Sequence, residues 1–284
     1  GERAGGAGAL RDVTLVIPEL DGLTAQLVPH LAEALGPDLA LRVAFRASGQ
    51  DACVDAVRRV VNDGAAAVLL AVEGEERRLR DCYAAAVVGA GAPVALLWRG
   101  VPGVEAPALA IDEEAAMRRM TEYLLSMGHR RLAYVGDDPT LVHGQQRYRG
   151  FLGSLLEHGH ELPMEWVFAG RLTDGTAGAR FAGVFGEAAR PTAVVCGADE
   201  RAAEALALLG RMGIACPDEV AVVGIGDAPY AGLLSTPLTS YRFDLRLLAA
   251  ASAAAVRALL AGEAAESVTV GGEVVRRASC GAAR

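Results

Sequence analysis

Short apolar segments alternate with segments that repeat apolar residues at helical spacing along most of the chain. Residues 13–18 are mostly apolar, and leucines then recur every four residues from Leu23 to Leu35, which is the spacing of one helix face. The same alternation continues to about residue 225. It predicts right-handed βαβ units, in which a parallel sheet is covered by helices on both faces.

The pattern gives an expected order of elements. The expected strands are 13–18, 39–45, 66–72, 93–98, 108–111, 132–136, 166–169, 193–197 and 220–225, with closing strands in 268–279. The expected helices are 23–35, 51–62, 75–89, 112–127, 145–157, one capped by Thr173 or Asp174, 199–212 and 243–260. Acidic caps at Asp51 and Asp112 support two of the helix starts.

The alternation restarts after Gly128, which indicates two Rossmann-like α/β lobes with parallel sheets. A length of 284 residues fits such a pair of lobes. The expected N-terminal lobe is 13–111 plus 243–265, and the expected C-terminal lobe is 112–241 plus 266–280. Three crossover segments are expected to join them. Residues 1–12, rich in Gly and Ala, are expected to be a linker.

Composition and charge narrow the functional classes. The apolar runs are far shorter than the roughly 20 residues of a membrane helix, so no membrane span is expected. The start of the chain does not resemble a secretory signal, and five cysteines without a Cys-x-x-Cys pair favour reduced thiols in a cytoplasm. A formal charge of -8 opposes non-specific attraction to a phosphate backbone, so this chain alone is not expected to hold DNA.

The sequence has no evident catalytic motif. It lacks a Gly-x-Ser-x-Gly turn and a glycine-rich lysine phosphate loop, so neither an enzymatic function nor a cofactor is expected. Gly224 and Gly226 begin a dinucleotide-like pattern, but the third glycine is missing. His158 and His160 lack the further ligands of a metal site, and no metal is expected.

Ligands of open α/β sheets bind where parallel strands end. Two expected strands, 193–197 and 220–225, end in small residues followed by an aspartate. At the first end Ala198 precedes Asp199, and at the second Gly226 precedes Asp227. At each of these two strand ends, therefore, only one of the two residues has a polar side chain.

Six segments carry a combination of motifs in a fixed order and spacing. They are SMGHRRLAYVG at 126–136, RYRGF at 147–151, RPTAVVC at 190–196, PDEVAVVGIGD at 217–227, STPLTSYR at 235–242 and VVRRASC at 274–280. This combination resembles the effector-binding core of lactose-repressor-type (LacI/GalR) bacterial transcription regulators. The resemblance covers nearly all of 13–279 and implies the type I periplasmic-binding-protein-like fold.

The GHRR segment also has a structural interpretation. Gly128 is expected to end a helix, and the cations that follow it are expected to meet the helix carbonyls and the negative end of the helix dipole.

The resemblance implies a small-molecule effector held between the lobes. Arg147 opens the Arg-x-x-Gly-aromatic motif that the family uses as a polar anchor, although a surface ion pair is the alternative. Where the family has asparagine and aspartate, this chain has Ala198 and Gly226. Two lost hydrogen bonds cost about 3–4 kcal/mol, so the effector is expected to be sugar-like but altered, smaller, less hydroxylated or anionic, or to have been lost.

The candidate ligand-binding residues lie at strand ends or close to Arg147 in the sequence. They are Arg147, Asp227, Asp199, Trp98, Asp21, Asp112 and His143. For Trp98 packing in the core is an equal alternative, and Asp112 is expected to be a helix cap first.

The resemblance further implies a cytoplasmic homodimer that responds to its effector by changing operator binding. DNA contact is expected only through an N-terminal helix-turn-helix that has been removed or lies outside this chain. A periplasmic solute-binding protein is the first alternative, since it shares the lobes but should carry an export signal. An α/β enzyme is the weaker alternative.

Overall fold

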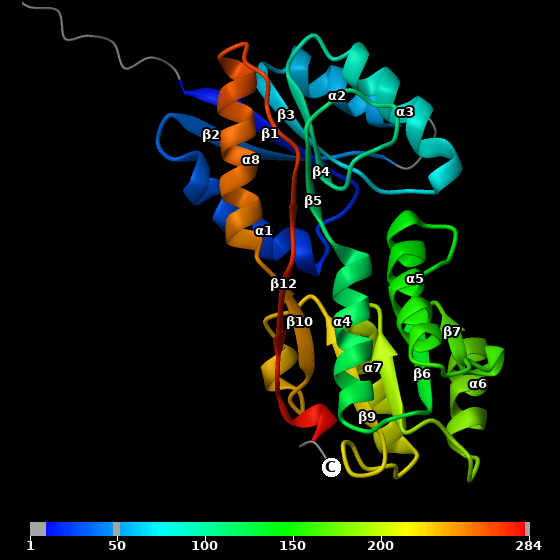
Figure 1. The fold of residues 1–284 in the computed structure, drawn as a ribbon. Helices are drawn as coiled ribbons and strands as arrows, with labels where there is room; N and C mark the ends of the chain where they lie inside the picture. Colours follow the sequence, from blue (N-terminus) through cyan, green and yellow to red (C-terminus); the bar gives the residue numbers. More distant parts are fainter. Residues whose placement is uncertain (1–9, 48–51, 282–284) are drawn as a thin grey trace, which may run out of the picture. The chain divides into compact units, whose positions relative to one another are not determined.

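The computed structural model describes residues 10–47 and 52–281 of the chain (Figure 1). The chain divides into two compact units. Unit 1 comprises Gly1–Val72, Arg77–Ile111 and Leu245–Val270, and unit 2 comprises Glu73–Glu76, Asp112–Asp244 and Gly271–Arg284. Each unit contains one six-stranded sheet. The predicted α/β fold with two mostly parallel sheets is confirmed.

The sheet of unit 1 has the order β11-β5-β4-β3-β1-β2, and all of its pairings are parallel. Its strands are β1 Arg11–Ile17, β2 Leu39–Phe45, β3 Ala65–Ala71, β4 Val94–Trp98, β5 Ala108–Ile111 and β11 Val268–Val270. Its helices are α1 Gly22–Leu35, α2 Ala52–Asn62, α3 Glu76–Val88 and α8 Leu245–Leu260. Nearly every residue of β3 and β4 is buried, as is typical of inner strands covered on both faces.

The sheet of unit 2 has the order β12-β10-β9-β8-β6-β7, in which only the β12–β10 pairing is antiparallel. Its strands are β6 Leu132–Gly136, β7 Val167–Ala169, β8 Ala193–Cys196, β9 Ala221–Ile225, β10 Thr239–Phe243 and β12 Gly272–Val275. Its helices are α4 Glu113–Ser126, α5 Val142–Glu157, α6 Gly175–Phe185 and α7 Asp199–Arg211, with short 3-10 turns Met164–Trp166, Ala231–Leu233 and Ala278–Cys280.

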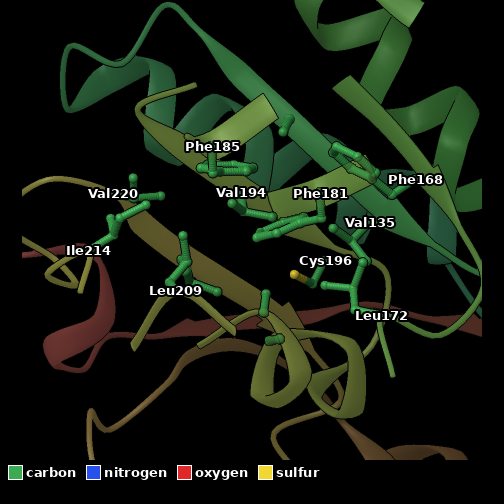
Figure 2. Packing of buried hydrophobic residues seen from close by; sticks show 14 of the residues in the cluster. Val135, Phe168, Leu172, Phe181, Phe185, Val194, Cys196, Leu209, Ile214 and Val220 are labelled. Atoms are coloured by element: carbon green, nitrogen blue, oxygen red, sulfur yellow. The ribbon is translucent and has the colours of Figure 1, made fainter. Parts of the chain in front are cut away.

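Aromatic rings fill one side of the unit 2 core (Figure 2). The Phe181 ring stacks on Phe185 with 4.2 Å between centroids and meets Phe168 at 5.2 Å. All three side chains are fully buried, and Val135 and Val194 of the central strands pack in the same cluster. This packing holds β6 and β8 in place, and the carboxyl ends of these two strands carry the candidate site.

The GHRR prediction is confirmed for Gly128 and Arg130, but Arg131 meets a carbonyl oxygen outside the helix. Gly128 has a φ of 95°, which favours glycine, and it follows the last turn of α4. The Arg130 guanidinium donates to the Leu125 carbonyl oxygen at 2.7 Å, and Arg131 Nε donates to the Arg190 carbonyl oxygen at 3.1 Å. These cations therefore satisfy backbone oxygens where α4 ends and β8 approaches.

Several expected boundaries were wrong. Arg11 and Asp12 belong to β1 rather than to a linker, because they continue its pairing with β2. Residues 239–242, which are absent from the expected strands, and residue 243, which was expected to begin a helix, form β10 inside the unit 2 sheet. Helix α5 begins at Val142 rather than 145.

The division into units also differs from the expected lobes. Strand β11 at 268–270 groups with unit 1, because it pairs with β5. Residues 243–244 and 73–76 group with unit 2. Residues 1–9 and the proposed cap Asp51 lie outside the described residues. Among the residues described, no helix combines the length and the apolar character that crossing a membrane requires.

Candidate ligand-binding site

Arg147 is a buried cation held between two carboxylates. Its Nη2 donates to Glu113 Oε1 at 2.7 Å, and its Nη1 donates to Asp137 Oδ2 at 3.1 Å. Arg147 is 8% exposed and Glu113 is 2% exposed, so water screens their interaction little. Burial alone lowers the pKa of Arg147, but Glu113 and Asp137 outweigh it and raise that pKa above its usual value.

The close approach of α4 and α5 brings Arg147 to Glu113. Gly150, one turn after Arg147, lies so near α4 that a Cβ there would meet the Glu114 carbonyl oxygen at 2.2 Å. Only glycine leaves room for this contact. The Arg-x-x-Gly motif thus has a local explanation: the glycine allows the helices to touch, and the arginine uses that proximity to reach the first turn of α4.

Asp137 is the centre of a wider polar cluster. It follows β6 directly, and its carboxylate meets Arg147 on one oxygen and Arg201 Nε on the other at 3.4 Å. His143 Nε2 lies 3.7 Å from Asp137 Oδ2. Arg201 also donates to Glu204 Oε1 at 2.8 Å. We name the set Glu113, Asp137, His143, Arg147, Arg201 and Glu204 the Arg147 cluster. It joins residues of α4, α5 and α7 with the end of β6.

Tyr134 adds an unpaired hydroxyl beside this cluster. Its ring is 3% exposed, and its hydroxyl is buried without a hydrogen-bond partner in the described residues. Burial raises the pKa of Tyr134, so the hydroxyl stays protonated at neutral pH. A Cβ on Gly197 would come within 3.5 Å of this hydroxyl and 3.7 Å of Arg147 Cδ. The small residue at the end of β8 therefore leaves Tyr134 and Arg147 facing the same space.

Asp199 is a buried carboxylate bonded within the protein. Its Oδ1 accepts from the Ser240 hydroxyl at 2.6 Å, and its Oδ2 accepts from the Ala228 amide at 2.6 Å. Burial raises the pKa of Asp199 to about 6, although these two hydrogen bonds oppose the shift. Asp199 thus ties the start of α7 to β10 and to the turn after β9.

Asp227 is also engaged internally. It has a φ of 46°, which is uncommon for a residue with a side chain, and its amide donates to the Ser240 hydroxyl oxygen at 3.0 Å. Its carboxylate is 2.7 Å from Arg242 on one oxygen and 2.7 Å from Arg277 on the other. Two cations from β10 and the segment after β12 therefore balance this charge.

The remaining candidates begin helices or end strands. Asp112 caps α4, where its Oδ1 accepts from the Ala115 amide at 2.9 Å, and it directly precedes Glu113. In unit 1, Asp21 caps α1 by accepting from the Thr24 amide at 2.6 Å. Trp98 ends β4 with a φ of 76°, is 3% exposed, and its indole N–H has no partner in the described residues.

Among the predicted residues, Arg147 and His143 both belong to the Arg147 cluster. Asp112 lies next to the cluster, because it directly precedes Glu113 in the sequence. Asp199 and Asp227 share Ser240 but are bonded to other partners. Sequence reasoning missed Glu113, Asp137, Arg201 and Tyr134. The available signal was position: Asp137 follows an apolar strand, and Glu113 follows a helix cap. Across residues 10–47 and 52–281, no three His, Cys, Asp or Glu side chains are placed to hold a metal ion.

We expect the stability of the protein to fall as pH rises from about 4 to about 6, through the titration of Asp199. Its pKa is higher in the folded state than the usual 3.8, so the folded form binds a proton that the unfolded form has released. This contribution is fully present below about pH 4 and is lost above about pH 6.

Substitution of Asp199→Asn should flatten this part of the pH profile of the unfolding free energy, measured by urea denaturation. Glu187→Gln, at an exposed position of unit 2 that does not contribute to the Asp199 shift, serves as the control and should leave the profile nearly unchanged. An identical slope in wild type and Asp199→Asn would contradict the assignment.

A family model described as periplasmic binding protein-like domain matches residues 121–280, which is more than half of the chain. The fold and this match define the class: the chain belongs to the periplasmic binding protein-like domain family.

The most informative relatives are LacI-type regulators. The HTH-type transcriptional regulator GalR of Salmonella typhimurium (strain SL1344) is 27% identical over 164 residues, which is 58% of this chain and 48% of GalR. The chain thus spans about half the length of this relative. The structure of a transcriptional regulator CelR–cellobiose complex is 25% identical with a TM-score of 0.81, covering 95% of this chain and 85% of CelR.

A lac repressor dimer bound to operator and the anti-inducer ONPF has the same fold, at 20% identity and a TM-score of 0.79, covering 97% of this chain and 83% of the repressor. The resemblance to LacI/GalR regulators is therefore confirmed.

Proposed function

We propose that this chain is the ligand-sensing domain of a LacI-type bacterial transcriptional regulator. The observation that carries the proposal is the Arg147 cluster, placed at the carboxyl ends of β6 and β8 in a chain of the periplasmic binding protein-like family. Ligands of open parallel sheets bind at this edge. The relatives named as transcriptional regulators support a sensory rather than a catalytic role.

The charge balance of the cluster favours a neutral, hydroxyl-bearing effector. Both terminal nitrogens of Arg147 already face a carboxylate, so an anion would be repelled by Glu113 and Asp137. A hydroxyl group can accept from an arginine and donate to a carboxylate. The cellobiose in the CelR structure is a ligand of this chemistry. Ala198 and Gly226 offer no side-chain hydrogen bonds, so weak binding is expected.

Operator binding, in this proposal, belongs to a helix-turn-helix part of the full-length protein, which acts as a cytoplasmic homodimer. The printed HTH-type name of GalR and the operator-bound lac repressor dimer support this part. The effector changes the affinity for operator DNA because it binds the two functional states unequally. The proposed function involves no catalytic step.

Thermal-shift and calorimetric titration of the chain would test the effector class. The panel contains neutral mono- and disaccharides, including cellobiose, together with small carboxylates and inorganic phosphate. A neutral saccharide should raise the melting temperature, and Arg147→Lys should abolish the shift because a single ammonium cannot replace the guanidinium fork. Arg118→Gln, which changes an exposed ion pair of α4 and α5, is the control.

Tight binding of an anion without any saccharide response would contradict the effector class. The regulator assignment has its own test: the full-length protein should bind DNA upstream of its gene in a fluorescence anisotropy assay, and the saccharide identified above should change that affinity. Failure of the full-length protein to bind DNA would contradict the assignment.

A further inference from the structure

Two polar atoms without partners border Gly197, which directly follows β8. The Tyr134 hydroxyl and the Nε atom of Arg147 are both buried, and neither has a hydrogen-bond partner in the described residues. A Cβ built on Gly197 would lie 3.5 Å from the Tyr134 oxygen and 3.7 Å from Arg147 Cδ, to which Nε is bonded. Both atoms therefore border the volume that a side chain at position 197 would occupy.

The packing around Tyr134 holds its hydroxyl in this position. The ring stacks on Phe151 with 5.1 Å between ring centroids, and it meets Tyr148 edge-on at 5.4 Å. Phe151 is fully buried, so the ring rests on a closely packed neighbour. A Cβ on Gly136 would clash with the ring and its hydroxyl. Glycine at this position therefore lets the ring extend to the carboxyl end of β6.

The two unpartnered atoms are costly for folding alone. A buried hydroxyl without a partner lowers stability, because it gives up its hydrogen bonds to water and gains none in the protein. Phenylalanine at position 134 would fill the same place without this cost. Arg147 Nε has the same disadvantage. Buried donors that converge on one point are typical of a binding site, where a ligand supplies their partner.

We propose that Tyr134, Arg147 Nε and Gly197 form a subsite for one acceptor oxygen of the effector. The inference rests on the proposed function, because it adds a contact to the ligand-binding edge of unit 2. Burial raises the pKa of Tyr134, so its hydroxyl keeps a hydrogen to donate at neutral pH. An arginine Nε donates one hydrogen and accepts none, so an atom shared by both groups must be an acceptor. A hydroxyl or acetal oxygen of a saccharide meets this requirement.

The charges beside the subsite favour a neutral oxygen over a carboxylate. Arg147 Nη1 and Nη2 donate to Asp137 and Glu113, which leaves Nε as the donor without a partner. A carboxylate at the subsite would gain the two donors but would also face the negative charges of Glu113 and Asp137. A saccharide oxygen gains the same donors without this repulsion. The subsite thus gives Tyr134 a role in selecting the class of ligand.

Isothermal titration calorimetry of two variants tests the subsite, with cellobiose and the neutral monosaccharides of the panel as probes. Tyr134→Phe removes one donor and should weaken binding by about five- to tenfold, the usual effect of one neutral hydrogen bond. Gly197→Ala should weaken binding by about tenfold or more, because its Cβ would occupy the place of the ligand oxygen.

Thermal unfolding without saccharide separates an effect on binding from an effect on folding. Tyr134→Phe should leave the melting temperature unchanged or raise it, because phenylalanine lacks the unpartnered hydroxyl. Gly197→Ala should also keep the wild-type melting temperature within a few degrees. Its Cβ would lie 3.4 Å from Gly136 Cα, the nearest atom, and the other neighbours are at ordinary contact distances.

The controls are changes of the same kind elsewhere in unit 2. Tyr123→Phe removes a hydroxyl that lies 3.6 Å from Cys280 Sγ, and Gly210→Ala adds a Cβ that would meet nothing within 4 Å. Both should bind the saccharide as the wild type does. A less stable Tyr134→Phe, or wild-type affinity in either Tyr134→Phe or Gly197→Ala, would overturn the subsite. A wild type that responds to no saccharide would overturn the effector class, and the subsite with it.

Discussion

Replacing Arg147 with alanine should lower the free energy of unfolding by about 3–5 kcal/mol, the usual cost of removing one partner of a buried ion pair. The substitution leaves the Glu113 carboxylate, which is 2% exposed, without its cation. Asp137 loses one of its two arginines as well. Urea denaturation followed by circular dichroism measures the change.

The control is an ion pair of the same two helices at the surface. Arg118 of α4 pairs with Glu157 of α5, with side chains 30% and 61% exposed. Exposed pairs contribute about 0–1 kcal/mol, so Arg118→Ala should cost far less than Arg147→Ala. The double variant Arg147→Ala/Glu113→Ala should lose less than the sum of the single changes. Equal costs for Arg147→Ala and Arg118→Ala would show that the Arg147 pair is not the buried anchor described above.

Introducing alanine at Gly150 should destabilise the protein by about 2 kcal/mol. Overpacking usually costs about 1–3 kcal/mol, and replacing a helical glycine returns at most about 1 kcal/mol. The added Cβ would meet the Glu114 carbonyl oxygen at 2.2 Å and Met117 Cβ at 3.1 Å. A backbone atom cannot swing aside as a side chain can, so α4 and α5 must move apart. The unfolding free energy and the melting temperature both report this change.

Gly153 provides the comparison within the same helix. A Cβ there would meet only the end of the Arg118 side chain at 3.3 Å, which can move at little cost. Gly153→Ala should therefore be neutral or stabilising by up to about 1 kcal/mol, because alanine favours the helix. If Gly150→Ala is as mild as Gly153→Ala, the close approach of α4 and α5 is not what places Arg147.

The two results are connected through one geometric requirement. Arg147 reaches Glu113 because Gly150 lets α5 lie against the first turns of α4. Separation of the helices in Gly150→Ala should weaken this ion pair. Adding Arg147→Ala to Gly150→Ala should then cost less than Arg147→Ala costs alone, which the same denaturation series will show.

The elements of the fold followed from local patterns. Apolar runs and helical leucine spacing predicted the alternation of strands and helices, because burial on both faces of a parallel sheet demands such runs. The prediction was weakest at residues 239–243. Their sequence TSYRF has polar side chains in a strand that is nevertheless largely buried, because Ser240 bonds to Asp199. A partner 41 residues away cannot be inferred from local periodicity.

The sequence also identified Arg147, through its motif, but not what surrounds it. It suggested a polar anchor for the effector, with a surface ion pair as the alternative, whereas the folded chain buries the guanidinium between two carboxylates. Asp199 and Asp227, which looked alike as acidic residues after strands, have different environments. One is buried with a raised pKa, and the other is held by Arg242 and Arg277.

The sequence by itself determined the class of fold, the family resemblance and the identity of the central arginine, because each depends on residue types at fixed spacing. Only the tertiary structure decided the charge balance of the cluster and the reason for Gly150. These depend on residues that are 10 to 64 positions apart in the chain, or on the distance between two helices. Burial and distance set the energy of interaction between two charges, and neither can be inferred from a local segment of sequence.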